Sequence, residues 1–137
     1  MTTYDSPTLG HRVDVAGRRL WFHRSGSGGP AVVFVPGAGS FGLDFLLVHE
    51  RVAQVSASVL YDRAGTGWSE DIELPRSADE VTDELRALLQ SAGLPAPYLL
   101  VGHSLGGLYV QRYAQRFPDE VAGLLLLDPA HEDWDLY

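Results

Sequence analysis

The feature that most constrains this chain is an apolar run that leads directly into a Gly-x-Ser-x-Gly pattern. Residues 98–101 read Tyr-Leu-Leu-Val, Gly-His-Ser-Leu-Gly follows at residues 102–106, and a helical stretch then continues to residue 117. A strand that becomes a helix within one residue forces the corner residue into a strained backbone and holds its side chain out at the carboxyl end of the sheet. Ser104 occupies that corner. We therefore predict Ser104 to be a nucleophile, with the amide of Leu105 directed at a developing oxyanion.

Composition limits the classes of protein to consider. The chain has 137 residues, 45% of them hydrophobic, which suits one globular domain with its own core. The formal net charge of −8 argues against nucleic acid and against an anionic membrane as partners. No apolar run is long enough to span a bilayer and no signal-peptide pattern opens the chain, so a cytoplasmic location is expected. The absence of cysteine excludes disulfides, a thiolate nucleophile and a cysteine-zinc site.

Strand and helix patterns alternate along the chain. Residues 1–10 are expected to form a disordered lead-in, and residues 11–137 a single domain. Strands are predicted at residues 11–15, 18–24, 31–35, 58–61, 98–101 and, as a last buried strand, 122–127. Helices are predicted at residues 43–53, at 78–92 behind a Ser77/Glu80 capping box, and at 105–117. This order predicts an α/β protein whose doubly wound, mostly parallel sheet is led in by an antiparallel hairpin, with ligands at the carboxyl ends of the strands.

Nucleophilic chemistry at Ser104 needs a base, because a serine hydroxyl is a weak nucleophile until a histidine, usually oriented by an acid, accepts its proton. His103 directly precedes Ser104 and should project away from the hydroxyl. Three other histidines lie in the predicted hairpin and first helix, where surface or packing roles are expected. His131 follows the last predicted strand, at the correct end of the sheet but one strand over. It is the candidate base within this chain.

Four motifs, in order, resemble the successive signatures of the α/β-hydrolase superfamily. They are Val-Pro-Gly-Ala-Gly at 35–39, Tyr-Asp-Arg-Ala-Gly-Thr-Gly-Trp-Ser at 61–69, Val-Gly-His-Ser-Leu-Gly-Gly at 101–107 and Leu-Asp-Pro-Ala-His at 127–131. The resemblance covers residues 11–137. It implies serine-dependent hydrolysis of an ester, thioester, lactone or similar small acyl substrate, with neither a metal nor an organic cofactor.

The resemblance also implies roles for individual positions. Ser104 matches the nucleophile, and Ala38, on the loop after the strand at residues 31–35, matches the second oxyanion donor beside Leu105. Asp128 matches the acid that a minority of members use. Asp62 and Arg63 match a structural turn, for which a solvated or loop-bridging pair is expected.

In the family the usual base follows the eighth strand, which would lie beyond Tyr137. The resemblance therefore implies the amino-terminal part of such a domain, truncated after the sixth strand. The strand at residues 122–127 would then have an unpaired edge and a partly bare face. Such surfaces favour association, so we expect the isolated chain to self-associate through this edge or to need a complementary segment.

Two alternatives remain open at this stage. Residues 37–42 read Gly-Ala-Gly-Ser-Phe-Gly, and Asp62 lies 20 residues past Gly42, as in a dinucleotide-binding module with its ribose-binding acid. The hairpin before this loop and the unexplained motif at residues 102–107 oppose that interpretation. The other alternative keeps the hydrolase fold without catalysis, as an incomplete binding or interaction protein.

Overall fold

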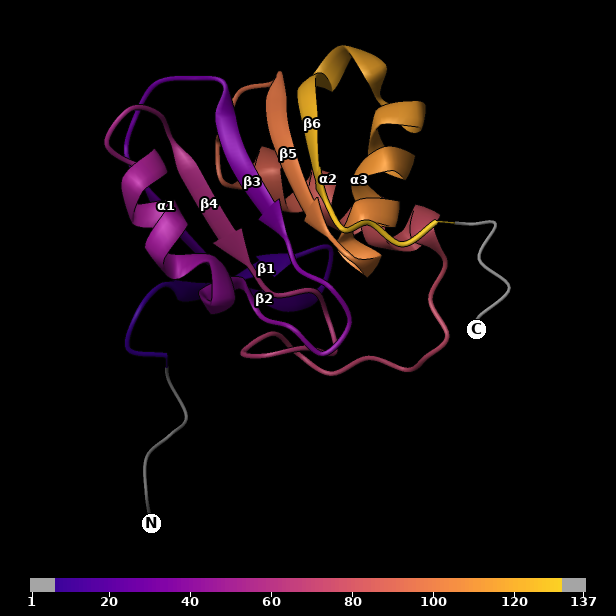
Figure 1. Cartoon of the computed structure of the whole chain (residues 1–137). Helices are drawn as coiled ribbons and strands as arrows, with labels where there is room; N and C mark the ends of the chain where they lie inside the picture. Colours follow the sequence, from indigo (N-terminus) through magenta and orange to yellow (C-terminus); the bar gives the residue numbers. More distant parts are fainter. Residues whose placement is uncertain (1–6, 132–137) are drawn as a thin grey trace.

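A six-stranded sheet with helices on both faces forms the body of the protein (Figure 1). The structure, a computed structural model, describes residues 7–131. The strands are β1 (His11–Val15), β2 (Arg18–Ser25), β3 (Ala31–Val35), β4 (Ser58–Tyr61), β5 (Tyr98–His103) and β6 (Val121–Leu127). The helices are α1 (Leu46–Val52), α2 (Ala78–Ser91) and α3 (Leu105–Arg116), with short 3-10 turns at Gly42–Phe45 and Pro118–Glu120. The predicted α/β class is confirmed.

Strand order brings several loops to one end of the sheet. The strands lie in the order β1-β2-β4-β3-β5-β6, where β1, β2 and β4 pair antiparallel and β4, β3, β5 and β6 pair parallel. The predicted leading hairpin is therefore present. Because parallel strands end at the same edge, the loops after β3, β4, β5 and β6 gather at the carboxyl end of the sheet.

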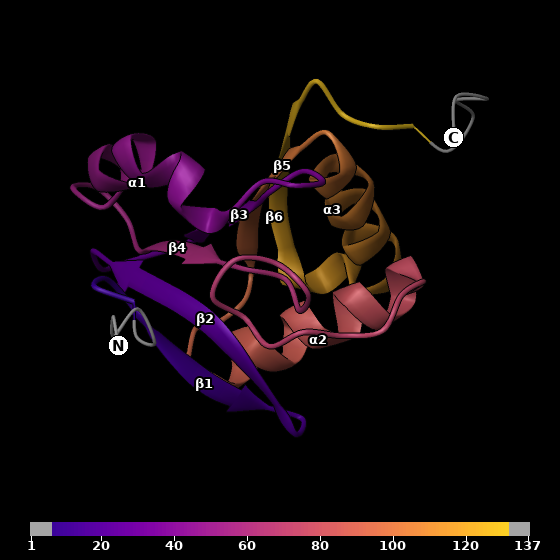
Figure 2. The same cartoon turned by 90° about the horizontal axis from the view of Figure 1, so that it is seen from below.

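The two faces of the sheet have separate apolar cores. Helix α1 lies on one face and helices α2 and α3 on the other, as the view from below shows (Figure 2). On the α2/α3 side the helices contribute Leu85, Leu88, Leu89, Val110 and Tyr113, all 1% exposed or less. The core on the α1 side is smaller and is formed by Trp21, Phe34, Leu60 and Val101.

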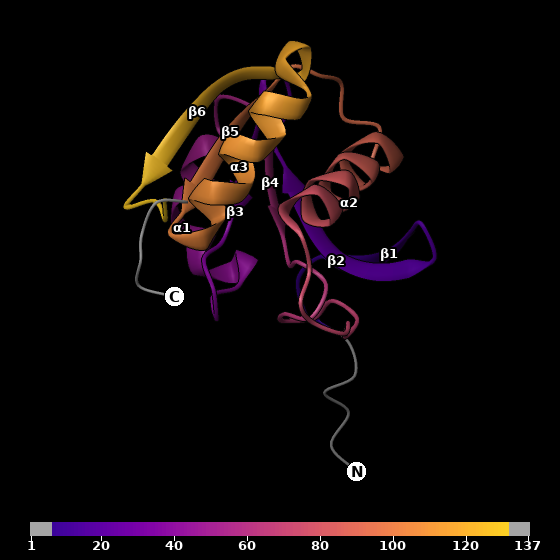
Figure 3. The same cartoon turned by 90° about the vertical axis from the view of Figure 1, so that its right-hand side faces the viewer.

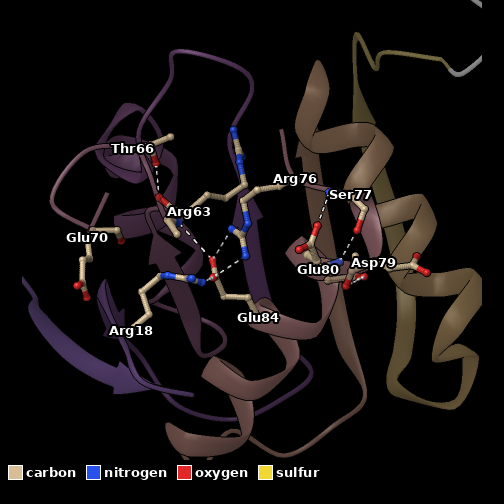
Figure 4. Close-up of polar contacts among 12 residues, drawn as sticks. Arg18, Arg63, Thr66, Glu70, Arg76, Ser77, Asp79, Glu80 and Glu84 are labelled. Carbon is tan, nitrogen blue, oxygen red and sulfur yellow. Dashed lines mark hydrogen bonds and ion pairs between the residues drawn. The ribbon is translucent and has the colours of Figure 1, made fainter. Parts of the chain in front are cut away.

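Helix α2 is fixed at its start and along one side by polar contacts (Figure 4). Its capping box is confirmed: the Ser77 hydroxyl accepts from the Glu80 amide at 3.1 Å, and the Glu80 carboxylate accepts from the Ser77 amide at 2.7 Å. One turn further on, the buried Glu84 carboxylate accepts from Arg18 of β2 and from Arg76, both at 2.8 Å. Glu84 thereby ties the hairpin and the loop after β4 to one helix.

Strand β6 differs from its predicted burial. The sequence predicts a buried strand, but Leu124, Leu125, Leu126 and Leu127 are 38%, 51%, 38% and 39% exposed. The reason is position: β6 lies along the outer edge of the sheet (Figure 3), and in the described part of the chain no strand pairs with its far side. Four consecutive leucines therefore place apolar surface on both faces of an open edge.

Two smaller differences concern loops. The first helix predicted at residues 43–53 is divided into the 3-10 turn Gly42–Phe45 and helix α1. In the predicted lead-in, residues 1–6 lie outside the described residues. Just beyond them, the carbonyl of Leu9 accepts a hydrogen bond from the Trp21 indole at 2.8 Å.

His49 is a fully buried histidine on α1. Its Nδ1 lies 2.7 Å from Ser58 Oγ, and its Nε2 has no partner among residues 7–131. Burial, and next the neighbouring His23, hold the pKa of His49 below its ordinary value of 6.5, while Glu50 acts in the opposite direction. The folded protein therefore keeps this ring neutral under conditions in which the unfolded chain protonates it.

We expect this histidine to make stability depend on pH. When the pH falls below the pKa of an ordinary histidine, about 6.5, His49 becomes protonated in the unfolded state but stays neutral in the folded state. The free energy of unfolding should therefore decrease. Urea unfolding between about pH 7.5 and about pH 5.5 measures the slope. His49→Gln should flatten it. An unchanged slope in His49→Gln would contradict this prediction.

Candidate active site

Ser104 stands at the turn between β5 and α3 in a backbone conformation that few residues with a side chain adopt. Its φ is 51° and its ψ is −119°, so the surrounding structure has to hold it there. Three backbone hydrogen bonds do so: the Ser104 amide donates to the Leu127 carbonyl at 3.1 Å, and the Ser104 carbonyl accepts from the amides of Ala130 at 2.8 Å and Gly107 at 2.9 Å. The side chain is half-buried and does not cap α3. Its hydroxyl is therefore not used in starting the helix.

The loop after β3 passes directly beside this serine. A Cβ added at Gly37 would lie 3.1 Å from Ser104 Cβ and 3.2 Å from His103 Nδ1. Glycine at this position lets the backbone of the loop approach the serine closely. The same contact places the His103 ring against Gly37.

The two predicted oxyanion donors line one cavity. Ala38 and Leu105 both border a hollow of about 450 Å³. Leu105 is the first residue of α3, where helix amides lack intrahelical partners and the helix dipole is positive. Further wall residues come from the loops and helices around it: Arg63, Ile72, Leu74, Val81 and Tyr109. A carbonyl oxygen placed near both amides would be held more strongly as it becomes negative.

Asp128 and His131 follow β6 and lie in different settings. Asp128 is exposed, with a φ of 43°, in the segment that is hydrogen-bonded to the Ser104 backbone. His131 borders a second, smaller hollow of about 190 Å³ together with Leu108, Gln111, Arg112 and Gln115 of α3. Ala38 and Leu105 do not border that hollow. The structure thus brings Asp128 to the strand end beside the serine and places His131 along α3.

The other histidines occupy separate places. His49 is buried under α1, and His11 and His23 belong to the hairpin strands. The hydrogen bonds of His23 and His49 are with Ser25 and Ser58, so these two rings have structural partners away from Ser104.

Asp62 is a buried loop anchor, which corrects two expectations. It is 1% exposed rather than solvated, and its carboxylate accepts from the amides of Gly42 at 2.8 Å and Trp68 at 2.9 Å. Burial raises the pKa of the Asp62 carboxyl, and these two amides partly offset the shift. The described contacts give Asp62 a structural role in joining two loops, and they do not support the dinucleotide-binding alternative.

Arg63 is the site residue whose role sequence reasoning missed. It is 6% exposed, and its guanidinium donates to the carbonyls of Pro36 and Gly37. The sequence places Arg63 in a turn after a strand, but it does not say which loop the side chain reaches. That contact depends on β3 and β4 being neighbours in the sheet.

Over residues 7–131 there is no group of three or more histidine, cysteine or acidic side chains that could hold a metal ion. No helix in the same residues is long and apolar enough to cross a membrane.

A mostly parallel sheet and a strained serine between strand and helix, next to a cavity that Ala38 and Leu105 border, are typical of an α/β protein of the hydrolase type. The chain belongs to the alpha/beta hydrolase family, whose family model matches residues 32–136. Membership in this family agrees with the resemblance carried by the four motifs.

Among its relatives, the pimeloyl-[acyl-carrier protein] methyl ester esterase of Chromobacterium violaceum is 42% identical over 100 residues, 72% of this chain and 37% of the esterase. The Bacillus subtilis protein YqjL is 35% identical over 111 residues, 81% of this chain and 44% of the relative. A solved thermophilic esterase from Thermogutta terrifontis superposes with a TM-score of 0.82 at 26% identity, over 87% of this chain and 46% of the esterase. The chain thus spans less than half the length of these relatives.

Proposed function

We propose that this chain carries the nucleophile and the oxyanion hole of a serine hydrolase that acts on a small acyl compound such as an ester, thioester or lactone. The observation that carries the proposal is the strained backbone of Ser104 at the start of α3, directly before Leu105, which borders a cavity together with Ala38. Hydrolase membership and the esterase relatives support the same reaction class.

In this mechanism, Ser104 Oγ attacks the acyl carbonyl carbon while a histidine takes the hydroxyl proton. The carbonyl oxygen becomes negative and is stabilised by the amides of Ala38 and Leu105. Collapse of this intermediate expels the alcohol or thiol, which receives the proton from the histidine. Water then attacks the acyl-enzyme by the same route, releasing the acid and restoring the serine.

The structure supports the proposed acid better than it supports a base within this chain. Asp128 is proposed as the acid because its segment is hydrogen-bonded to the Ser104 backbone. His131 is the candidate base within the chain, but its place beside α3 favours instead a histidine after the later strands of the family's sheet. We therefore expect residues 1–137 alone to acylate slowly.

Mass spectrometry tests this proposal. After incubation with a fluorophosphonate, fragmentation of the tryptic peptide of residues 87–112, which contains both Ser91 and Ser104, should place the adduct on Ser104, and unfolded protein should carry none. An adduct on another serine, or equal labelling of the unfolded protein, would overturn the assignment.

A binding or interaction role without catalysis is the second candidate, favoured by the open edge of β6. Its four leucines are between 38% and 51% exposed, and a long, uncharged edge strand can pair with another chain. In this candidate role the edge holds a second copy of the chain or a complementary strand.

Self-association through β6 is a separate prediction. Sedimentation velocity should show dimers or larger species that dissociate as the protein is diluted. Leu125→Lys should shift the population toward monomer, because a charge on an edge strand opposes pairing. Leu47→Lys, at an 80% exposed position on α1, is the matched control and should change little. A wild-type protein that stays monomeric at every concentration would exclude this association.

A further inference from the structure

The guanidinium of Arg63 is buried between the loop after β3 and helix α3. Its Nη1 donates to the Pro36 carbonyl, and its Nη2 donates to the Gly37 carbonyl at 2.9 Å. The guanidinium carbon lies 5.2 Å from the centre of the Tyr109 ring on α3. One cation thus joins the loop that carries Ala38 to the helix that begins at Leu105.

The charge of Arg63 is balanced in an unusual way. Within residues 7–131, no salt bridge joins Arg63 to a carboxylate. The adjacent Asp62 uses its two carboxylate oxygens to bind the amides of Gly42 and Trp68. A buried cation needs compensating dipoles. Among residues 7–131 the hydrogen-bond acceptors of Arg63 are the two loop carbonyls, so the guanidinium interacts most strongly with this loop.

These contacts orient the peptide group between Gly37 and Ala38. Cis peptide bonds among residues 7–131 occur at three X-Pro positions, so this peptide is trans. In a trans peptide the carbonyl and the N–H point in opposite directions. Because the Gly37 carbonyl faces Arg63, the Ala38 N–H faces away from it. Gly37 itself lies beside Ser104, with 3.1 Å between an added Cβ and Ser104 Cβ.

We propose that Arg63 is a positioning residue for the reaction: it turns the Ala38 amide toward the oxyanion and holds it there. This inference rests on the proposed function, in which Ala38 is an oxyanion donor. The Gly37 carbonyl also accepts from the Ser40 amide, at the longer distance of 3.3 Å. Charge-assisted hydrogen bonds are the stronger kind, so Arg63 rather than the Ser40 turn fixes the peptide.

The test compares Arg63→Gln and Arg63→Lys with wild type by the rate of Ser104 acylation by an activated ester. Losing an oxyanion donor costs on the order of 10²–10³-fold in rate, so Arg63→Gln should acylate roughly 10- to 100-fold more slowly with little change in the half-saturating ester concentration. Arg63→Lys keeps the positive charge but not the planar pair of donors, so its acylation rate should lie between those of wild type and Arg63→Gln. Rates are normalised to folded protein by circular dichroism.

Arg12→Gln is the matched control. Arg12 also donates to a backbone carbonyl, that of Trp68 at 2.8 Å, and lies 6.0 Å from an aromatic ring centre, but it belongs to β1. Its loss should leave acylation unchanged. If Arg63→Gln and Arg12→Gln acylate at the wild-type rate, Arg63 has only a structural role and the inference is overturned.

A second measurement separates this inference from the proposed function. The crystal structure of Arg63→Gln, or of Arg63→Lys if the first does not fold, should show the peptide between Gly37 and Ala38 rotated from its wild-type orientation. An unrotated peptide overturns the positioning role whatever the activity. If wild type acylates no faster than Ser104→Ala, the proposed function fails, and a rotated peptide would still support the orienting role of Arg63.

Discussion

Replacing Ser104 with alanine is expected to remove acylation by fluorophosphonates and to lower hydrolysis of an activated ester well below the wild-type rate. In the proposed mechanism Ser104 Oγ forms the new bond, whereas the fold around it does not need the hydroxyl, which caps no helix. An oxyanion hole and substrate binding alone still give roughly 10³–10⁴-fold acceleration over water, so we expect Ser104→Ala to keep a residual rate above that of the solution.

The comparison variant is Ser91→Ala, which changes an exposed serine at the end of α2. It should retain the wild-type rate, and both variants should unfold at the same urea concentration as wild type. Hydrolysis in Ser104→Ala equal to that of wild type would show that another group reacts, and would remove the basis for the proposed hydrolase.

The second large effect is expected at Gly106, where α3 crosses over the end of β3. An added Cβ would lie 2.0 Å from the Val35 carbonyl oxygen and 2.7 Å from that of Pro36. Both are backbone atoms of a buried strand and its loop, so they cannot rotate away as a side chain could. Gly106→Ala should therefore lower the free energy of unfolding by about 3 kcal/mol, at the upper end of overpacking costs. It should also displace the loop that carries Ala38.

Gly123→Ala provides the matched control on β6, because nothing lies within 4 Å of its added Cβ. Its free energy of unfolding should change by less than about 1 kcal/mol, as expected for an unobstructed site. Urea unfolding of both variants measures the difference. If Gly106→Ala were as stable as Gly123→Ala, α3 would not pack closely enough on the end of β3 to exclude a Cβ at residue 106.

Local sequence signals predicted most of the fold. The strands at residues 31–35 and 58–61 and the capping box at Ser77 were predicted at their observed positions, because each depends on neighbouring residues alone. The turn at Ser104 was predicted for the same reason. The exposure of β6 was not predicted. An apolar strand is buried only if other elements pack on it, and the residues of the strand itself do not show whether they do.

The parts of the site that escaped prediction are contacts between distant segments. Arg63 reaches Pro36 and Gly37 across 26 or 27 residues of chain, and His49 meets Ser58 from a helix on one face of the sheet. A motif gives the residue type and its local turn, but not the partner that strand order brings beside it. For Asp62, whose two amide partners lie on different loops, the expected loop-bridging role was found and the expected solvation was not.

The hydrogen bonds at Ser104 have a consequence for how firmly this proposed nucleophile is held. Its amide donates to Leu127 at the end of β6, and its carbonyl accepts from Ala130 just beyond that strand as well as from Gly107 of α3. Segments with few buried apolar contacts open more readily than the core of a protein. Part of the rigidity of this turn therefore depends on the edge strand β6, so we expect a chain that pairs with β6 to make Ser104 less mobile as well.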